Sequence, residues 1–185
     1  QMWLPLPASD AFQTVSVKSM QVPGKHQVLT DSAHGNKVLY TVLGPEHAGQ
    51  AVDIRYDVVR LEKSAYEAPA ADAAKYLQAE KLVPANDQIK AAAGKATQGK
   101  AGDLMRARAL YDHVIDGMAY KKCGEGWGKG DAVYACNAQS GNCTDFHAYF
   151  IALARSVGIP ARFAIGAAIA SDRDEGGVDG YHCWA

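Results

Sequence analysis

Cys143 is the residue of this sequence best placed for covalent chemistry. It stands in the stretch SGNCTDFHAYFIALARSVGIPARF, which predicts a loop, a helix and the start of a strand, and it falls at or near the first helical position. Unpaired N–H groups and the helix dipole favour a negative charge there, and the thiolate is the nucleophilic form of cysteine. The N–H of Cys143 could also donate to the oxyanion of a reacting carbonyl. Cys143 is therefore a candidate nucleophile, with a small buried thiol as the structural alternative.

Two histidines are candidates for the general base that such a nucleophile needs. His147 lies four residues after Cys143 on the same helix face, but an imidazole one turn into a helix points along its flank, which favours packing or hydrogen bonding. His182 lies on a strand expected near the end of the chain, which the fold could bring opposite the start of the helix. On that strand His182 and Trp184 face one way, whereas Cys183 faces the other as a buried packing thiol.

Further polar residues surround the candidate nucleophile in the sequence. Trp127 in a glycine-rich loop and Gln139 could each supply a second oxyanion donor. Structural alternatives exist for both, because Trp127 could close the edge of the core and Gln139 could hydrogen-bond its own loop. Asp145 is expected to be a first-turn acid favoured by the helix dipole, and it could also orient His147.

The four cysteines do not pair as C-x-x-C, so neither a zinc site nor a cofactor is expected, and a redox or metal protein is the weakest interpretation. Cys123 and Cys136 flank a short glycine-rich loop and could be bridged in an oxidising compartment, or remain free thiols. The stretch DRDEGGVDG superficially resembles a calcium loop but lacks the EF-hand spacing, so we expect a solvated turn.

Composition and charge argue against several classes of partner. The 185 residues are 48% hydrophobic and carry 19 Lys and Arg against 20 Asp and Glu, which gives no electrostatic basis for binding nucleic acid or an anionic membrane. No apolar run approaches the roughly 20 residues of a spanning helix. The first residues, QMWLPLPASD, lack the features of a signal peptide, although a start at Gln1 leaves an exported origin open.

The elements that must position these residues fall into two parts. Between Val15 and about Lys63, strand-like runs rich in β-branched residues alternate with turns, and they predict a β-rich domain over 1–65. The composition then shifts to Ala, Lys, Gln and Glu, which predicts helices in a second domain over 66–185. The expected helices are 72–81, 86–96 with Asn86 as the cap, and 101–118 with a buried stripe of Leu104, Ala107, Tyr111, Val114 and Met118.

The later part of the second domain predicts a loop, a helix and two strands. A loop of about 20 residues follows Tyr120, and loops of that length are usually functional or disordered. In the final helix, Phe146, Phe150, Leu153 and Val157 follow helical spacing, and Gly158 followed by Ile159-Pro160 is a termination signal. The segments ARFAIGAAIA and YHCWA then read as strands on either side of a turn.

Together, these residues resemble the transglutaminase-like superfamily of papain-like enzymes. Members of that family carry a Cys at a helix start, then R-x-x-G-I-P-A-R, then an H-x-W strand. The corresponding segments here are GNCTDFHAYFIALARSVGIPARF and GYHCWA, and the loop GWGKGDAVYAC before them is similar to that of bacterial members. The resemblance covers Ser140–Ala185.

The resemblance implies an α+β fold, with a β-sandwich-like N-terminal domain followed by a papain-like transglutaminase core whose helices pack on an antiparallel sheet. It implies that Cys143 is the nucleophile and His182 the base, with Trp184 and His147 as further site candidates. The expected reaction forms a thioester from an amide or peptide and passes it to water or to an amine. The expected partner is a protein or peptide substrate, without nucleic acid or membrane insertion, in a periplasmic or secreted bacterial protein.

One feature of the family is missing from this sequence. The family completes a Cys–His–Asp triad with an Asp on the strand after the His strand, but this sequence stops at Ala185. We therefore expect a core truncated at its C-terminus, with the third triad residue beyond Ala185. The alternatives are a substitute residue elsewhere, or a catalytically incomplete module that binds a peptide or assembles with a partner.

Overall fold

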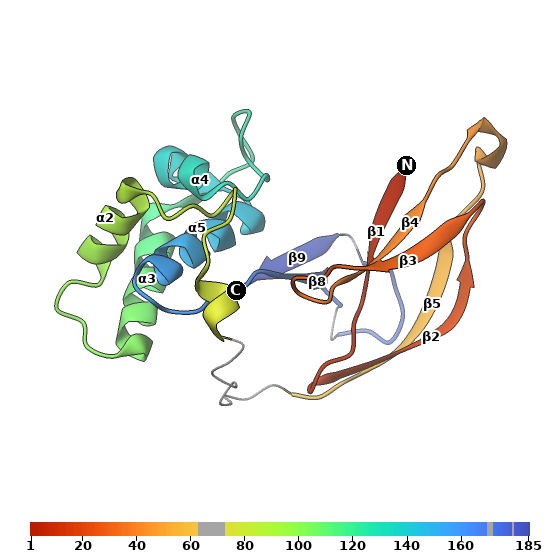
Figure 1. The fold of residues 1–185 in the computed structure, drawn as a ribbon, viewed down its shortest axis with the longest axis horizontal. Helices are drawn as coiled ribbons and strands as arrows, with labels where there is room; N and C mark the ends of the chain where they lie inside the picture. Colours follow the sequence, from red (N-terminus) through yellow and green to blue (C-terminus); the bar gives the residue numbers. More distant parts are fainter. Residues whose placement is uncertain (63–72, 170–171, 179) are drawn as a thin grey trace. The chain divides into compact units, whose positions relative to one another are not determined.

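The computed structural model describes residues 1–62, 73–169, 172–178 and 180–185, and the chain divides into two compact units, Gln1–Tyr66 and Glu67–Ala185 (Figure 1). The fold is mixed α+β, with antiparallel strand pairs in both units and α-helices in the second. Within the described parts of the chain, no helix is long and apolar enough to cross a lipid bilayer.

The first unit consists of two small antiparallel sheets. One has the strand order β1-β4-β3 and the other pairs β2 with β5. The elements are β1 (Met2–Leu6), β2 (Gln13–Gln21), β3 (His26–Thr30), β4 (Lys37–Thr41), the 3₁₀ turn η1 (Pro45–His47) and β5 (Asp53–Arg60). Leu39 and Thr41 on β4 are fully buried, and the Thr41 hydroxyl donates to the Lys25 carbonyl at 3.0 Å. The strands expected from the β-branched runs are confirmed.

The second unit is mainly helical and ends in a short hairpin. Its elements are η2 (Ala74–Leu77), α2 (Asp87–Ala96), α3 (Asp103–Gly117), β6 (Ala119–Tyr120), α4 (Ala132–Ala138), β7 (Ser140–Gly141), α5 (Cys143–Ser156), β8 (Ala164–Ala167) and β9 (Tyr181–Trp184). Strands β6 and β7 pair in parallel, and β8 and β9 pair antiparallel. The expected caps are confirmed, because the Asn86 side chain accepts from the Ile89 N–H at 2.9 Å, and Gly158 follows α5 with a φ of +81°.

Helix α5 is the centre of the core of this unit. It packs against α2, α3, α4 and β9, and Figure 1 shows it lying among the other helices. Tyr149 and Leu153 of α5 are almost or completely buried, together with Ile89 of α2 and Leu110 of α3. A helix enclosed in this way has its position set by packing on several sides.

Three expectations for this unit are wrong in part. Of the helix expected at 72–81, residue 72 lies outside the described residues, and the described part contains the short 3₁₀ turn η2. On α3, Val114 and Met118 are buried as expected, but Leu104 and Tyr111 are 83% and 52% exposed and Leu110 is buried in their place. The reason is that the side of α3 that carries Leu110 packs into the core around α5. The long loop after Tyr120 contains α4, whose N-cap Asp131 accepts from the N–H groups of Val133 and Tyr134.

Candidate active site

The first turn of α5 leaves one backbone donor available beside the Cys143 thiol. The Asn142 side chain accepts from the N–H groups of Thr144 at 2.9 Å and Asp145 at 3.4 Å. The Asp145 carboxylate accepts in return from the Asn142 N–H at 3.0 Å, which completes a capping box. Among the described residues, the Cys143 N–H has no acceptor. It is therefore the group in this turn that could donate to an oxyanion.

Asp145 also fixes the glycine-rich loop against the start of α5. Its carboxylate is fully buried and accepts from the N–H of Gly128 at 2.6 Å and of Gly130 at 3.1 Å. Both glycines have positive φ, and a Cβ on Gly130 would lie 3.0 Å from the Thr144 methyl group. Asp145 is thus a first-turn acid, as expected, but its partners are loop N–H groups and the capping residue.

The two side chains proposed as second oxyanion donors, Trp127 and Gln139, lie in different places. Trp127 directly precedes Gly128, so its indole belongs to the loop that Asp145 holds at the start of α5, and it is 37% exposed. Gln139 is the C-cap of α4 with a φ of +48°, and its amide donates to the Cys136 carbonyl at 2.6 Å. Trp127 therefore lies on the loop that is held at the start of α5, whereas the Gln139 amide is hydrogen-bonded in the last turn of α4.

His147 is hydrogen-bonded within α5. Its Nδ1 lies 2.7 Å from the Cys143 carbonyl oxygen, so Nδ1 carries the proton and donates, and Nε2 is the basic nitrogen. This geometry agrees with the hydrogen-bonding alternative given by the sequence. It also means that Asp145 does not orient His147.

The residues of β9 alternate as the sequence predicts. Cys183 is fully buried, and its Sγ lies 3.4 Å from the Thr144 hydroxyl in the first turn of α5. His182 and Trp184 are exposed, with their ring centroids 6.3 Å apart. Within the described residues, His182 makes no hydrogen bond. The structure therefore brings Cys183 to the first turn of α5, and it places His182 on the exposed face of β9.

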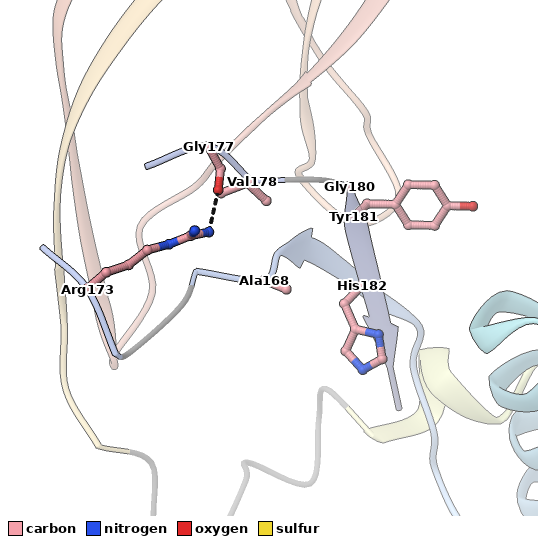
Figure 2. Close-up of a pocket in the computed structure, with 7 residues that line it drawn as sticks. All are labelled: Ala168, Arg173, Gly177, Val178, Gly180, Tyr181 and His182. Atoms are coloured by element: carbon pink, nitrogen blue, oxygen red, sulfur yellow. Dashed lines mark hydrogen bonds between the residues drawn. The ribbon is translucent and has the colours of Figure 1, made fainter. Parts of the chain in front are cut away.

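His182 faces an open pocket of about 370 Å³ (Figure 2). The pocket is lined by Ala168, Arg173, Gly177, Val178, Gly180, Tyr181 and His182. The Arg173 guanidinium donates to the Gly177 carbonyl at 2.9 Å and so links two of the residues that line the pocket. Figure 2 shows the imidazole of His182 and the phenol of Tyr181 pointing in different directions from β9. Cys143 is not among the described residues that line this pocket.

Two buried groups near α5 have shifted pKa values. Burial raises the pKa of the Cys183 thiol, a hydrogen bond with Thr144 lowers it, and interaction with the Cys143 thiol raises it. Burial, followed by interaction with Cys136, also raises the pKa of the Tyr149 phenol, whose oxygen lies 3.1 Å from Nε2 of His113. Both groups are therefore held in the protonated form at neutral pH.

All four cysteines are free thiols, so the bridge considered between Cys123 and Cys136 is not formed. Cys123 is exposed and Cys136 is half-buried. Among the described residues, no cluster of His, Cys, Asp or Glu side chains is arranged to hold a metal ion.

The sequence alone missed two features of this region. An Asn followed three residues later by an Asp is a signal for the capping box, so that part of the role of Asp145 could have been found. Its bonds to Gly128 and Gly130 and the contact of Cys183 with Thr144 join residues 15 or more positions apart, and no local pattern indicates them.

Comparison with known proteins identifies relatives of this arrangement. The model of the transglutaminase-like superfamily matches residues 90–185. An uncharacterized protein of Haemophilus influenzae is 25% identical over 183 aligned positions, which cover 89% of this chain and 49% of that protein. The chain thus spans about half the length of that relative.

A solved structure shares the fold. The crystal structure of a "Putative Cysteine Protease from Cytophaga hutchinsonii" superposes with a TM-score of 0.66 and 16% sequence identity, covering 98% of this chain and 64% of that chain. At this level of identity the likeness shows the fold alone. It agrees with a mixed α+β fold of the cysteine-enzyme type.

Proposed function

The chain belongs to the transglutaminase-like superfamily, and on that basis we propose that it is a cysteine enzyme of the acyl-transfer type. Cys143 is the nucleophile, and the substrate is an amide or peptide bond of a protein or peptide. The observation that carries the proposal is the first turn of α5, where the thiol stands beside a backbone N–H without an acceptor among the described residues. Resemblance to bacterial, commonly exported members is the ground for a periplasmic or secreted location.

The reaction proceeds through a thioester. The Cys143 thiolate attacks the carbonyl carbon, and the oxyanion that forms accepts a hydrogen bond from the Cys143 N–H. The C–N bond then breaks, and the proton originally taken from the thiol passes to the leaving amine. Water or a second amine attacks the thioester, returns a proton to the thiol and releases an acid or a new amide. Trp127, on the loop held by Asp145, is the proposed second oxyanion donor.

His182 is the proposed base, and the geometry sets a condition on this role. In the structure the buried side of β9 presents Cys183 to α5, and His182 lies on the other side. Because strand side chains alternate with a period of two, a shift or rotation of β9 by one residue would exchange the two faces. The proposed catalytic state therefore requires β9 to present His182 to Cys143.

The position of Cys183 also favours a second function. If β9 keeps its buried thiol against the first turn of α5, no base reaches Cys143, and the chain acts as a catalytically incomplete module that binds a peptide or assembles with a partner. Such a module would bind its peptide equally well with Cys143→Ala, and it would form no covalent adduct with an electrophilic peptide.

The test is the rate of alkylation of each cysteine against pH, read by mass spectrometry in the wild type, His182→Ala and His147→Ala. We expect Cys143 of the wild type to react rapidly at neutral pH and to slow strongly in His182→Ala, with little change in His147→Ala. An activity assay on the same proteins follows the cleavage of a peptide library and the incorporation of a fluorescent primary amine into protein.

Cys143→Ala provides the decisive control for the activity. Any amide cleavage or amine transfer that survives in Cys143→Ala contradicts the proposed nucleophile. If alkylation of Cys143 is equal in the wild type and in His182→Ala, His182 is not its base, and the incomplete module becomes the better description.

A further inference from the structure

The thiols of Cys143 and Cys183 lie at one contact between α5 and β9. Cys183 is 0% exposed and Cys143 is 9% exposed, and the two elements pack directly on each other. The Cys183 sulfur lies 3.4 Å from the hydroxyl of Thr144, the residue after Cys143 in the same helical turn. The Cys143 thiol is also among the causes that raise the pKa of the Cys183 thiol, after burial, which agrees with two neighbouring sulfurs. Two cysteines on facing elements at such a contact are suited to a disulfide.

The two thiols differ in their surroundings. Cys143 stands at the first position of α5, beside a backbone N–H that has no acceptor among the described residues, and such positions are typical of reactive cysteines. Cys183 is fully buried against the first turn of α5, and this burial raises the pKa of its thiol. A thiolate reacts with a hydroperoxide, whereas a neutral thiol nearby is the partner that captures the oxidised product. In this pair Cys143 is the cysteine that would react with the hydroperoxide, and Cys183 is the cysteine that would then form the disulfide with it.

The other two cysteines are placed differently. Cys123 is exposed in the loop before α4, with its carbonyl bonded to the Tyr134 hydroxyl at 2.9 Å. Cys136 lies near the end of α4, where the Gln88 amide donates to its sulfur at 3.5 Å and the Tyr149 phenol interacts with it. Neither has an interaction with Cys143 or Cys183 among the described residues. They serve as internal controls.

From this arrangement we infer that Cys143 and Cys183 form a reversible disulfide when the protein meets a hydroperoxide, and that this bond blocks the Cys143 thiol. Hydrogen peroxide transfers one oxygen atom to the Cys143 thiolate, which gives a sulfenic acid and, after protonation, water. The Cys183 sulfur then attacks the Cys143 sulfur, the S–O bond breaks, and the hydroxyl leaves with the Cys183 proton as a second water. A dithiol reductant restores both thiols.

The bond has a structural consequence for the proposed enzyme. It would tie β9 to the first turn of α5 with Cys183 inward, and by alternation it would keep His182 on the outer face. In this respect the inference rests on the proposed function, because the disulfide switches off catalysis only if Cys143 is the nucleophile. The formation of the disulfide does not depend on that function.

The test treats the reduced protein with hydrogen peroxide, removes the peroxide with catalase, alkylates the remaining thiols and maps them by mass spectrometry. We expect one linkage between the peptides of Cys143 and Cys183, near-complete loss of Cys143 alkylation, and full recovery after dithiothreitol. The variants Cys123→Ser and Cys136→Ser should form the same linkage. In Cys183→Ala, Cys143 should instead pass to sulfinic and sulfonic acids that dithiothreitol does not reverse.

The outcomes separate this inference from the proposed function. Absence of the linkage, or a linkage that pairs either thiol with Cys123 or Cys136, overturns the inference and leaves the proposed nucleophile untouched. A linkage in a protein that shows no amide-cleaving or amine-transfer activity when reduced supports the disulfide and counts against the enzyme. Cys183→Ser serves as a second variant if Cys183→Ala unfolds, since it keeps the size of the side chain.

Discussion

The two ends of the candidate site are held by very different means. At the start of α5, a buried carboxylate binds three backbone N–H groups and the helix behind it is enclosed by the core. The hairpin of β8 and β9 has one buried side chain, Cys183, while Ile165, Tyr181 and Trp184 are 52%, 55% and 40% exposed. The end of the site that carries Cys143 is therefore fixed by many contacts, and the strand that carries His182 is fixed by few.

This difference in packing indicates that the β8–β9 hairpin can change its position more easily than α5. A two-stranded hairpin gains little stability by itself, so its position depends on what packs against it. Helix α5 has no comparable freedom, because displacing it would open the core and leave the N–H groups of Gly128, Gly130 and Asn142 without their acceptor. A rearrangement that brings His182 to Cys143 would thus move β9 and leave α5 in place.

The largest expected effect comes from Asp145→Ala. The variant leaves three N–H groups unsatisfied in a buried site, and we expect it to lower the free energy of unfolding by about 3–5 kcal/mol. Asp103→Ala is the matched control, because Asp103 is also a first-turn acid but has a 69% exposed side chain, and it should change stability by less than about 0.5 kcal/mol. Urea denaturation measures both. Equal effects would mean that Asp145 does not hold the loop.

The second prediction compares the truncation of one aliphatic side chain on α5 with the truncation of one on the β8–β9 hairpin. Leu153→Ala opens a cavity in the core of α5 and should cost about 2–5 kcal/mol, whereas Ile165→Ala on β8 should cost less than about 1 kcal/mol because the side chain is half in water. The same denaturation curves give both values. A cost at Ile165 that approaches the cost at Leu153 would show that the hairpin is packed in solution as firmly as α5.

The smallest expected effect is a change in the free energy of unfolding with pH, caused by Tyr149 of the buried helix α5. Burial, then Cys136, raises the pKa of the Tyr149 phenol above its usual 10.0, so the unfolded chain loses this proton at lower pH than the folded chain. The stability from this group is complete below about pH 10 and falls as the pH rises further. Tyr149→Phe should lower the free energy of unfolding by about 1 kcal/mol at neutral pH, because His113 loses its hydrogen-bond partner, and it should reduce the loss of stability at alkaline pH.

Tyr111→Phe is the control for the loss of a phenol hydroxyl, because Tyr111 is 52% exposed on α3. It should change the free energy of unfolding at neutral pH by less than about 0.5 kcal/mol. An alkaline slope that is the same in Tyr149→Phe as in the wild type would contradict the assignment to Tyr149.

Much of the site was determined by the sequence, because local rules are sufficient for it. The span of α5, the end of that helix at Gly158 and the position of Cys143 in its first turn follow from helical spacing and termination signals. The opposite orientation of His182 and Cys183 follows from the alternation of a strand. The motif that identifies the family also lies in these local segments, so the superfamily could be inferred before the fold.

Only the tertiary structure decided which faces meet. Alternation says that His182 and Cys183 point in opposite directions, but not which of them contacts α5, and in the structure it is Cys183. Periodicity likewise placed Val114 and Met118 on the buried face of α3, but packing buried Leu110 in place of Leu104 and Tyr111. The bonds of Asp145 to Gly128 and Gly130 join residues far apart in the chain. Such contacts depend on the free energy of the whole packed unit, because the core has room for only some of the apolar faces. Which faces are buried therefore depends on all the elements together, and it cannot be deduced from one segment.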